Sequence, residues 1–450
     1  MQTVVLAAGR GTRMRPLTDR RPKPMLPVAD RPLLAHTLDV AVEGGASRFV
    51  IVVGYRDEAV RDYVGDTYAG VPVTYVTQTE QRGTADAVRL AGDELEKGPF
   101  VVLNGDAIFD SDGISRLYRS GPAVACYCVD DPTQYGVLDV EEGNVTGVIE
   151  KPADPPSDLV NAGAYQFPAS ARDWLDVPES ERGEHELTDV LERTADAVDV
   201  RAVPLEHWLD VGRPWELLAA NEWKLAAPNT PTGPSTPTGT GTPTAPDTQT
   251  DAGTPMDAGL GGTRREQPDD SAASVSSMAR LDVERNPIAG TVSPDATLNG
   301  PVVVENGATV REGVTIDGPA LVRRGATVGP NAYLRGATLV GPGARVGHAV
   351  EIKNSLLFAG ATVGHLSYVG DSILGRDVNL GAGTTVANLR HDDKPVELTV
   401  ASERVSTGRR KFGVVLGDEA KTAIDTALNA GVTLSTGATT APGEAVLRDR

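Results

Sequence analysis

Residues 310–347, VREGVTIDGPALVRRGATVGPNAYLRGATLVGPGARVG, carry an aliphatic residue at every sixth position, with Gly, Pro, Asn and other small residues among those between. The same frame continues in both directions through Val292, Leu298, Val304, Val310, Ile316, Val322, Val328, Leu334, Val340, Val346, Ile352 and Phe358. This period is typical of a parallel β-helix, in which each aliphatic side chain points into the prism and small residues turn the corners. We therefore expect residues 280–450 to form a left-handed parallel β-helix of hexapeptide repeats.

The hexapeptide frame shifts after this run. Val363 and Val369 share one phase, and Leu374, Leu380 and Val386 share another. A loop-like insertion at residues 387–412 follows before repeat-like sequence resumes at Gly413. Interrupted coils are where a solenoid usually carries its function. However, hexapeptide β-helices serve either as oligomerisation scaffolds or as acyltransferases, so this fold alone does not decide the activity.

The first half of the chain has a different pattern. Apolar runs of strand length (VVLAAG, FVIVVG, VTYVTQ and FVVLNGD) alternate with helical stretches such as LLAHTLDVAVEGG and TADAVRLAGDEL. This alternation predicts an α/β domain at residues 1–225, with a Rossmann-like, mostly parallel sheet covered on both faces. Ligands of such sheets bind outside the carboxyl ends of the strands. Between the two domains, residues 226–279 form a Thr/Pro/Gly-rich tract that we expect to be a disordered linker.

Composition narrows the class of partners. The formal net charge is −20, from 62 acidic and 42 basic residues, which argues against non-specific nucleic-acid binding. An acidic surface keeps a protein soluble, or it marks a salt-adapted, halophilic protein; the spread of Asp through both halves favours the second. We find neither a signal peptide nor an apolar run long enough to span a membrane, so we expect a cytoplasmic protein. Cys126 and Cys128, two residues apart on a predicted strand, are expected to be ordinary strand residues.

The first predicted strand leads into LAAGRGTRMRPLTDRRPKPMLPV, residues 6–28. Two glycines let a backbone approach a phosphate chain, although GxG alone also fits a simple strand-to-helix turn. The complete string resembles the sugar-1-phosphate nucleotidylyltransferase family. That resemblance implies that the nucleotide contacts Ala8, Gly9, Gly11 and Thr12, and that Arg13 and Lys23 are catalytic cations.

Further motifs match the same family in order: QTEQRGTADAV, LNGDAIF, YGVLD, VIEKP, NAGAYQF and HWLDVGRPWELLAAN. The resemblance implies nucleobase contacts at Gln78, Gly83 and Thr84, and sugar-phosphate contacts at Gly136, Glu150, Lys151 and Asn161. It also implies Mg²⁺ ligands at Asp106 and Asp210. For any single carboxylate the alternative is a helix cap or a surface charge. The string RMRPLTDRRPKPMLP looks closer to the glucose-1-phosphate thymidylyltransferase type than to the bacterial uridylyltransferase type, so the nucleotide substrate stays open between UTP and dTTP.

The segment HAVEIKNSLLFAGATVGHLSYVGDSILGRDVNLGAGTTVANLRHDDKPV, residues 348–396, resembles the acetyltransferase half of a bifunctional family. Its members, here of archaeal type, join glucosamine-1-phosphate acetyltransferase to N-acetylglucosamine-1-phosphate uridylyltransferase. The resemblance implies a catalytic base at His365 and an amino-sugar-phosphate site at Arg335, Lys353, Tyr368 and Asn379. It places acetyl-CoA contacts at Ala382, Asn388 and Lys394. The alternative for His365 is a solvated surface position, as expected for His348.

Three hypotheses follow from these patterns. The first is a bifunctional enzyme that acetylates glucosamine 1-phosphate with acetyl-CoA and then uridylylates the product, with the homotrimer that its family implies. The second is a nucleotidylyltransferase of thymidylyltransferase type whose β-helix is structural or regulatory. The third is a non-catalytic assembly subunit built from the same two folds. The motif residues near the N-terminus speak against the third, and His365 with Tyr368 and Asn379 favours the first over the second.

Overall fold

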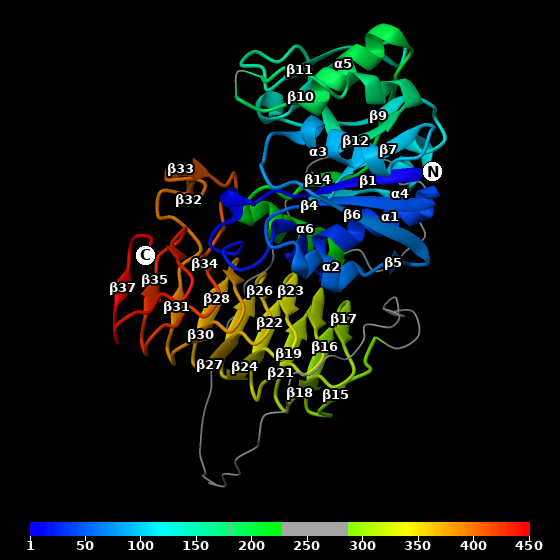
Figure 1. Ribbon diagram of the computed structural model, residues 1–450. Coiled ribbons are helices and arrows are strands. Elements are labelled where there is room, and N and C mark those ends of the chain that lie inside the picture. Colours follow the sequence, from blue (N-terminus) through cyan, green and yellow to red (C-terminus); the bar gives the residue numbers. More distant parts are fainter. Residues whose placement is uncertain (181, 227–286) are drawn as a thin grey trace, which may run out of the picture. The chain divides into compact units, whose positions relative to one another are not determined.

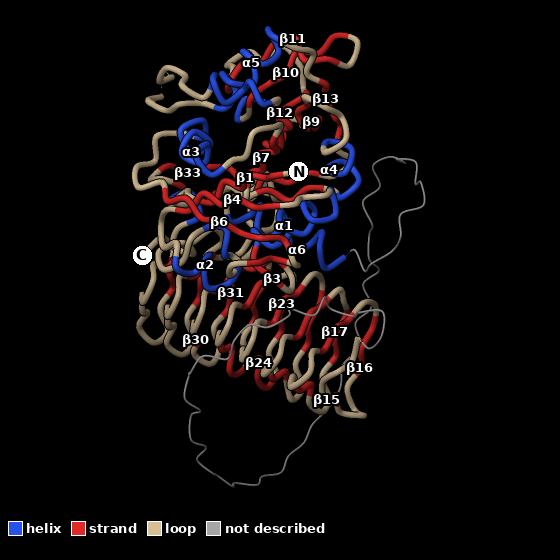
Figure 2. The backbone as a smooth tube through the Cα atoms, turned by 45° about the vertical axis from the view of Figure 1, so that its right-hand side comes forward, coloured by secondary structure: helices blue, strands red, loops and turns tan. Residues whose placement is uncertain are grey.

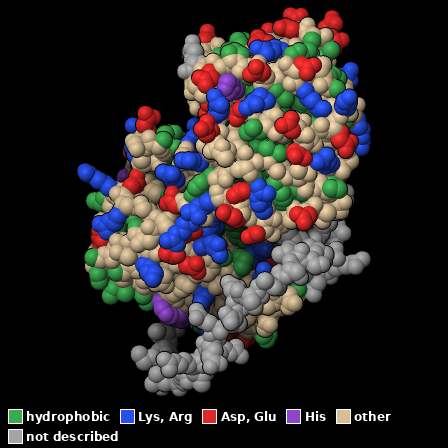
Figure 3. Space-filling model, in the orientation of Figure 1, with side chains coloured by type: hydrophobic (Ala, Val, Ile, Leu, Met, Phe, Trp, Pro, Cys, Tyr) green, Lys and Arg blue, Asp and Glu red, His purple; other side chains and the backbone are tan. Residues whose placement is uncertain are grey.

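The computed structural model describes residues 1–180, 182–226 and 287–450 (Figure 1). The predicted linker at residues 226–279 lies outside the described residues, except for Ala226. The described regions on either side of that gap belong to one compact unit. On the face seen in Figure 3, acidic and basic side chains are interspersed.

The N-terminal region is built on one ten-stranded sheet in the order β10-β11-β13-β9-β12-β7-β1-β4-β6-β5. Strands β7, β1, β4 and β6 are parallel neighbours, and antiparallel β12 joins β7 to β9. The strands are β1 (Gln2–Ala7), β4 (Arg48–Val53), β5 (Thr67–Tyr68), β6 (Val71–Thr77), β7 (Phe100–Asn104), β9 (Ala123–Cys128), β10 (Gly136–Glu141), β11 (Asn144–Glu150), β12 (Leu159–Phe167) and β13 (Arg201–Pro204). Short pairs β2–β3 (Pro27–Val28, Arg31–Pro32) and β8–β14 (Ala107–Phe109, Trp208–Asp210) lie outside it. The predicted Rossmann-like domain is therefore confirmed.

The central strands β1, β4 and β7 are buried on both faces of the sheet, which explains their continuous apolar runs. Val4 packs in one cluster with Ala85 and Val88, whereas its neighbour Val5 packs in another with Leu34 and Leu38. Figure 2 shows helices on both sides of the central strands. The helices are α1 (Leu33–Gly44), α2 (Glu58–Val64), α3 (Thr84–Ala91), α4 (Ser111–Leu117), α5 (Leu187–Ala197) and α6 (Pro214–Ala226). No helix among the described residues has the length and apolar character needed to cross a bilayer.

The C-terminal region is a parallel β-helix with three sheets, as the hexapeptide period predicts (Figure 1). Its six-stranded sheet contains β15 (Thr291–Val292), β18 (Thr309–Val310), β21 (Thr327–Val328), β24 (Arg345–His348), β27 (Thr362–His365) and β30 (Asn379–Leu380). The eight-stranded sheet contains β16 (Thr297–Asn299), β19 (Thr315–Asp317), β22 (Tyr333–Arg335), β25 (Glu351–Lys353), β28 (Tyr368–Gly370), β31 (Thr385–Val386), β35 (Ala427–Leu428) and β37 (Ala445–Val446). The seven-stranded sheet contains β17 (Val302–Val304), β20 (Ala320–Val322), β23 (Thr338–Val340), β26 (Leu356–Leu357), β29 (Ile373–Leu374), β34 (Val415–Leu416) and β36 (Thr433–Leu434).

One position of the predicted frame is wrong. The prism core takes Leu357 rather than Phe358, so the frame shifts one hexapeptide earlier than the sequence suggests. Phe358 packs on the outside of the seven-stranded sheet, in a buried cluster with Leu339, Leu356 and Ile373. The outward-facing side chain of Phe358 is thus buried too. An aromatic side chain can fill this outer cluster as well as the interior of the prism, so residue type does not distinguish the two positions.

The insertion at residues 387–412 is not only a loop. It contains an antiparallel hairpin of β32 (Glu397–Val400) and β33 (Glu403–Ser406), whose Leu398 and Val400 are buried. The chain then re-enters the solenoid, where β34 pairs with β29. The coil stack therefore continues past the insertion, as the returning repeats predict.

Candidate active sites

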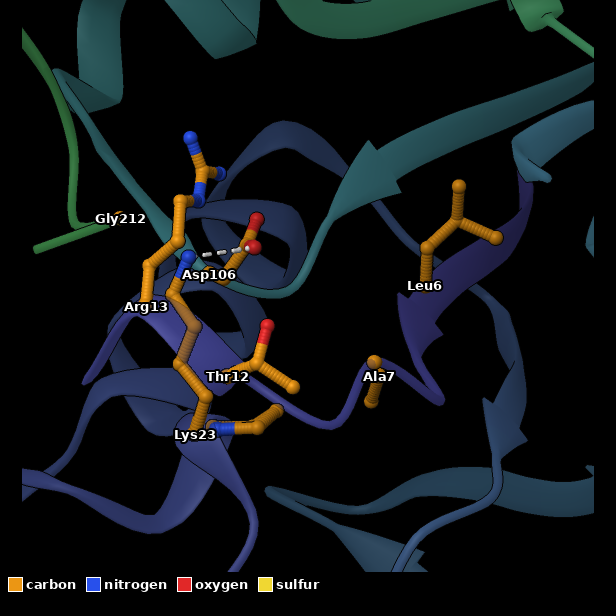
Figure 4. Close-up of a pocket in the computed structure, with 10 residues that line it drawn as sticks. Leu6, Ala7, Thr12, Arg13, Lys23, Asp106 and Gly212 are labelled. Carbon is orange, nitrogen blue, oxygen red and sulfur yellow. Dashed lines mark hydrogen bonds and ion pairs between the residues drawn. The ribbon is translucent and has the colours of Figure 1, made fainter. Parts of the chain in front are cut away.

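A cavity opens where β1 ends in the N-terminal region. Its lining includes Gly9, Gly11, Arg13, Lys23 and Asp106, together with Leu6, Ala7, Thr12, Pro24 and Gly212 (Figure 4). The loop after β1 and the strand β8 region thus contribute the predicted nucleotide-binding and catalytic residues to one place. Ala8 is buried directly beside this lining.

The two glycines of this loop are needed for different reasons. Gly11 has a φ of +60°, and a Cβ there would lie 2.7 Å from Cβ of Lys23. A side chain at Gly11 would therefore strain the turn and displace Lys23, which the sequence predicts to be a catalytic cation. A Cβ at Gly9 would meet no protein atom within 4 Å and would project into open space. Packing within the protein therefore does not require glycine at position 9, whereas a side chain there would occupy space at the cavity.

Lys23 lies between the two predicted metal ligands. Its Nζ is 2.7 Å from Oδ2 of Asp106 and 3.9 Å from Oδ1 of Asp210. Asp210 reaches this place because β14 pairs antiparallel with β8, with Asp210 opposite Ala107. Burial lowers the pKa of Lys23, but the attraction of Asp106 and Asp210 outweighs it, so this pKa is raised and the lysine stays charged.

The pKa of Asp210 is raised, chiefly by burial, which the charge of Lys23 offsets only in part. A carboxylate in such a place gains from a further cation. Two convergent carboxylates suit Mg²⁺, which commonly takes one or two protein carboxylates and completes its shell with substrate phosphates and water. Among the described residues no group of three or more His, Cys, Asp or Glu side chains is arranged for a metal. Asp106 and Asp210 alone thus fit an ion that is bound together with the nucleotide.

The three predicted nucleobase residues lie together before and at the start of α3. Gln78 is buried and donates to the carbonyl of Gly83 at 3.2 Å and to Asp86 at 2.9 Å. Thr84 Oγ1 accepts the backbone N–H of Leu187 at 3.0 Å. These side chains therefore tie the loop to its neighbours.

The predicted sugar-phosphate residues also come together. Gly136 is the register partner of Glu150 across β10 and β11, and a Cβ at Gly136 would lie 3.0 Å from Glu150 Oε2 and 3.7 Å from Cβ of Asn161. Lys151 Nζ is 3.3 Å from Glu150 Oε1. Sequence reasoning missed Arg182, which donates to Glu150 at 3.1 Å and to Glu186 at 2.6 Å. The charged segment at residues 179–186 is the signal that could have identified it.

In the solenoid, three predicted amino-sugar-phosphate residues share the outer face of the eight-stranded sheet. Arg335 and Lys353 are register partners on successive coils. Tyr368 is the partner of Glu351 on the next coil. Asn388, at the start of the insertion, donates to the hydroxyl of Tyr368 at 3.2 Å. The parallel stacking of identical coils is what lines up these separate positions.

His365 and Asn379 belong to the six-stranded sheet instead. His365 is the register partner of His348 on β24, and Asn379 is the partner of Thr362. Ala382 lies at the corner beside His365, because Gly383 donates its N–H to the carbonyl of His365 at 3.1 Å. Lys394 is exposed on the insertion. One chain therefore does not unite Asn379 with Arg335 and Lys353 on one face.

Two acidic residues of this surface were not predicted. Glu351 accepts a hydrogen bond from Arg335 Nε at 2.8 Å, and Asp371 accepts one from Lys353 Nζ at 2.6 Å. Each acidic side chain therefore neutralises one cation of the proposed phosphate site. Asp371 ends the string GHLSYVGD, so its position was visible in the motif although its partners were not.

Comparison with known proteins matches both regions. Residues 2–226 match the family model described as nucleotidyl transferase, and residues 316–437 match the model described as GMPPB C-terminal domain. Over 436 residues the chain is 34% identical to the bifunctional protein GlmU of Methanocaldococcus jannaschii, which covers 96% of this chain and 91% of that protein. It is 30% identical to a bifunctional sugar-1-phosphate nucleotidylyltransferase/acetyltransferase of Sulfurisphaera tokodaii, covering 100% of this chain and 98% of that one. Over 227 residues, 48% of this chain and 92% of the relative, it is 40% identical to the UTP–glucose-1-phosphate uridylyltransferase AglF of Haloferax volcanii.

Proposed function

Because this chain belongs to the bifunctional GlmU family and carries that family's nucleotidyl transferase region, we propose that it makes UDP-N-acetylglucosamine in two steps. The solenoid transfers acetyl from acetyl-CoA to glucosamine 1-phosphate. The N-terminal region then joins the product to UMP from UTP and releases pyrophosphate. The observation that carries the second step is Lys23 held between Asp106 and Asp210 in a cavity that the loop after β1 lines.

The uridylyl step needs charge control rather than a protein nucleophile. A phosphate oxygen of the sugar phosphate attacks the α-phosphorus of UTP, and the bond from that phosphorus to the β-phosphate oxygen breaks. Arg13 and Lys23 stabilise the charge that builds up on the phosphates, while Gly136, Glu150 and Asn161 orient the sugar. Mg²⁺ held by Asp106 and Asp210 supplies Lewis-acid neutralisation of the triphosphate.

The acetyl step needs a base, since the ammonium group of glucosamine 1-phosphate is not a nucleophile. His365 takes the proton from this nitrogen, which attacks the thioester carbonyl carbon. The carbon–sulfur bond then breaks, and coenzyme A leaves as the thiol after it receives a proton. Arg335 and Lys353 bind the sugar's phosphate, and backbone amides near Ala382 stabilise the oxyanion of the tetrahedral intermediate.

A homotrimer would complete this second site. His365 and Asn379 lie on the six-stranded sheet, whereas Arg335, Lys353 and Tyr368 lie on the eight-stranded sheet. A neighbouring copy that packs its six-stranded face against the eight-stranded face of this chain would join the two sets of residues. In a closed ring of three copies, each six-stranded face packs against the eight-stranded face of a neighbour, and no such face is left unpaired.

One assay of the purified chain tests both steps. Glucosamine 1-phosphate and acetyl-CoA should release a free thiol, and addition of UTP with Mg²⁺ should release pyrophosphate. The net charge of −20 motivates the use of high and low salt, because a salt-adapted surface loses stability when salt no longer screens it. Both co-substrates are products of cytoplasmic metabolism, and we place the reaction there. A chain with no thiol release at any salt concentration would not be an acetyltransferase.

The likeness of the N-terminal region to a UTP–glucose-1-phosphate uridylyltransferase favours a second candidate substrate. The same assay therefore includes glucose 1-phosphate and dTTP. Faster pyrophosphate release with glucose 1-phosphate than with N-acetylglucosamine 1-phosphate would identify a uridylyltransferase of glucose metabolism with a separate solenoid. Preference for dTTP would identify the thymidylyltransferase type.

A further inference from the structure

Asp371 is the most enclosed charged group of the solenoid surface that carries Lys353 and Tyr368. Its side chain is 3% exposed, against 16% for Lys353. Its carboxylate accepts three side-chain hydrogen bonds: from Lys353 Nζ at 2.6 Å, from Asn388 Nδ2 at 2.5 Å and from Asn354 Nδ2 at 3.0 Å. Buried carboxylates with this many donors hold their partners in fixed directions.

The contact with Lys353 decides what this lysine can offer a ligand. An ammonium group has three N–H donors. One of them is used by Asp371, and it fixes the Nζ atom on the coil surface beside the register partner Arg335. No other hydrogen bond of Lys353 Nζ is formed within the described part of the chain, so its remaining donors can bind the phosphate of an amino sugar. Without Asp371 the four-carbon chain of Lys353 would lose this anchor and the rotamer order that it provides.

The hydrogen bond between Asn388 and Asp371 fixes the orientation of the Asn388 side-chain amide. Asn388 Nδ2 has two N–H donors, and these reach Asp371 Oδ2 and the hydroxyl of Tyr368. The amide oxygen is therefore directed away from Asp371, and no donor among the described residues bonds to it. A carboxylate accepts only, so it enforces this orientation. The free oxygen can accept an N–H of acetyl-CoA.

We propose that Asp371 is the positioning residue of the solenoid site and that its single carboxylate holds the sugar-phosphate side, through Lys353, and the acetyl-CoA side, through Asn388, in one arrangement. This inference rests on the proposed acetyl transfer. Asp371 itself touches neither substrate, so it acts through these two side chains.

The alternative is a purely structural carboxylate. Against it, the coil contacts of this residue are made by its backbone: its N–H donates to the carbonyl of Lys353 at 2.8 Å, and its carbonyl accepts from Gly413 at 2.8 Å. Its φ of +51° is a corner conformation that Asn adopts as readily as Asp. Asp371→Asn therefore keeps the coil, the corner and the shape, while it removes the charge and replaces one acceptor oxygen by an NH2 group that faces other donors.

The test compares Michaelis constants in the full-length chain. For Asp371→Asn we expect KM to rise about 10- to 100-fold for both glucosamine 1-phosphate and acetyl-CoA, because Lys353 and Asn388 each lose the charge-assisted contact that orients them. Lys353→Ala should raise KM for the sugar phosphate alone, and Asn388→Ala should raise KM for acetyl-CoA alone. The double variant Asp371→Asn/Lys353→Ala should be no worse for the sugar phosphate than Lys353→Ala, because the two act through one contact.

Asp418→Asn is the matched control. Asp418 is also buried on a solenoid corner and pairs with Arg21 at 2.6 Å, away from Lys353 and Asn388. It should lower the melting temperature as much as Asp371→Asn while both acetyl-transfer KM values stay within about twofold of the wild type. Equal KM values in Asp371→Asn and Asp418→Asn, or additive losses in the double variant, would overturn the positioning role alone. A wild-type chain without thiol release would overturn this role and the proposed acetyl transfer together.

Discussion

The N-terminal cavity and the solenoid surface solve the same problem, binding an anionic sugar phosphate, in different ways. In the N-terminal region one chain lines a single cavity with Arg13, Lys23 and Asp106. Antiparallel pairing of β14 with β8 brings Asp210, from a late segment of the chain, within 3.9 Å of Lys23. The solenoid stacks Arg335 and Lys353 on one face and His365 with Asn379 on another. The α/β sheet gathers its predicted residues within one chain, whereas the prism places its predicted residues on separate faces, which a second copy joins in our proposal.

The largest expected effect is a separation of the two activities. Lys23→Ala should lower pyrophosphate release by about 1,000-fold or more, because it removes a buried cation aimed at the phosphates. Thiol release from acetyl-CoA should stay within about twofold of the wild type, since the solenoid site shares no residue with this cavity. Parallel assays on one preparation measure both. Near-normal pyrophosphate release from Lys23→Ala would show that Lys23 and its cavity do not catalyse nucleotidyl transfer.

His365 gives the converse separation. His365→Ala should lower thiol release about 100- to 10,000-fold, the usual contribution of a general base, with pyrophosphate release unchanged. His348→Ala is the matched control, because His348 is the register partner of His365 one coil earlier. Equal losses in the two variants would mean that neither histidine is the base.

Subunit mixing tests whether two faces make one solenoid site. Arg335→Ala and Asn379→Ala should each lose acetyl transfer, since each removes one half of the site. Trimers reassembled from an equal mixture should regain activity at about a quarter of the sites, those that pair an intact face from each variant. The control is Arg335→Ala mixed with Lys353→Ala, two changes on the same face, which should regain none. Recovery in the control but not in the first mixture would reverse the assignment of faces.

The smallest expected effect is on the pH dependence of the stability of the N-terminal region, which contains His36. Burial, and then the charge of Lys224, lowers the pKa of His36 in α1 to about 4. The unfolded chain takes up a proton near pH 6.5 and the folded chain does not, so stability is unaffected above pH 6.5 and falls as the pH drops toward 4. The loss should be roughly 2 kcal/mol between pH 6.5 and 5.

Tryptophan fluorescence during urea unfolding measures this change in the N-terminal region, which contains all four tryptophans, Trp174, Trp208, Trp215 and Trp223. In His36→Gln, which can still donate to the carbonyl of Val28, the urea midpoint should vary less over this pH range. A midpoint whose pH dependence is the same in both proteins would show that His36 is protonated equally when folded and unfolded.

The sequence alone predicted the β-helix, because the aliphatic residue at every sixth position marks the side chains that point into the prism, and this direction is a local property of each strand. It also predicted the α/β domain and, by motif, the residues of the N-terminal cavity. It did not predict the shift of Phe358 to the outside of the prism, since an aromatic residue suits either buried position equally well.

Only the tertiary structure decided which distant residues meet. Lys23 lies between Asp106 and Asp210 because two short strands pair across a long stretch of chain. Asp371 contacts both Lys353 and Asn388 because a corner of one coil abuts the coil before it and the insertion after it. Periodicity and motifs are local properties of a chain, whereas such meetings depend on strand register and packing, which the whole fold sets at once.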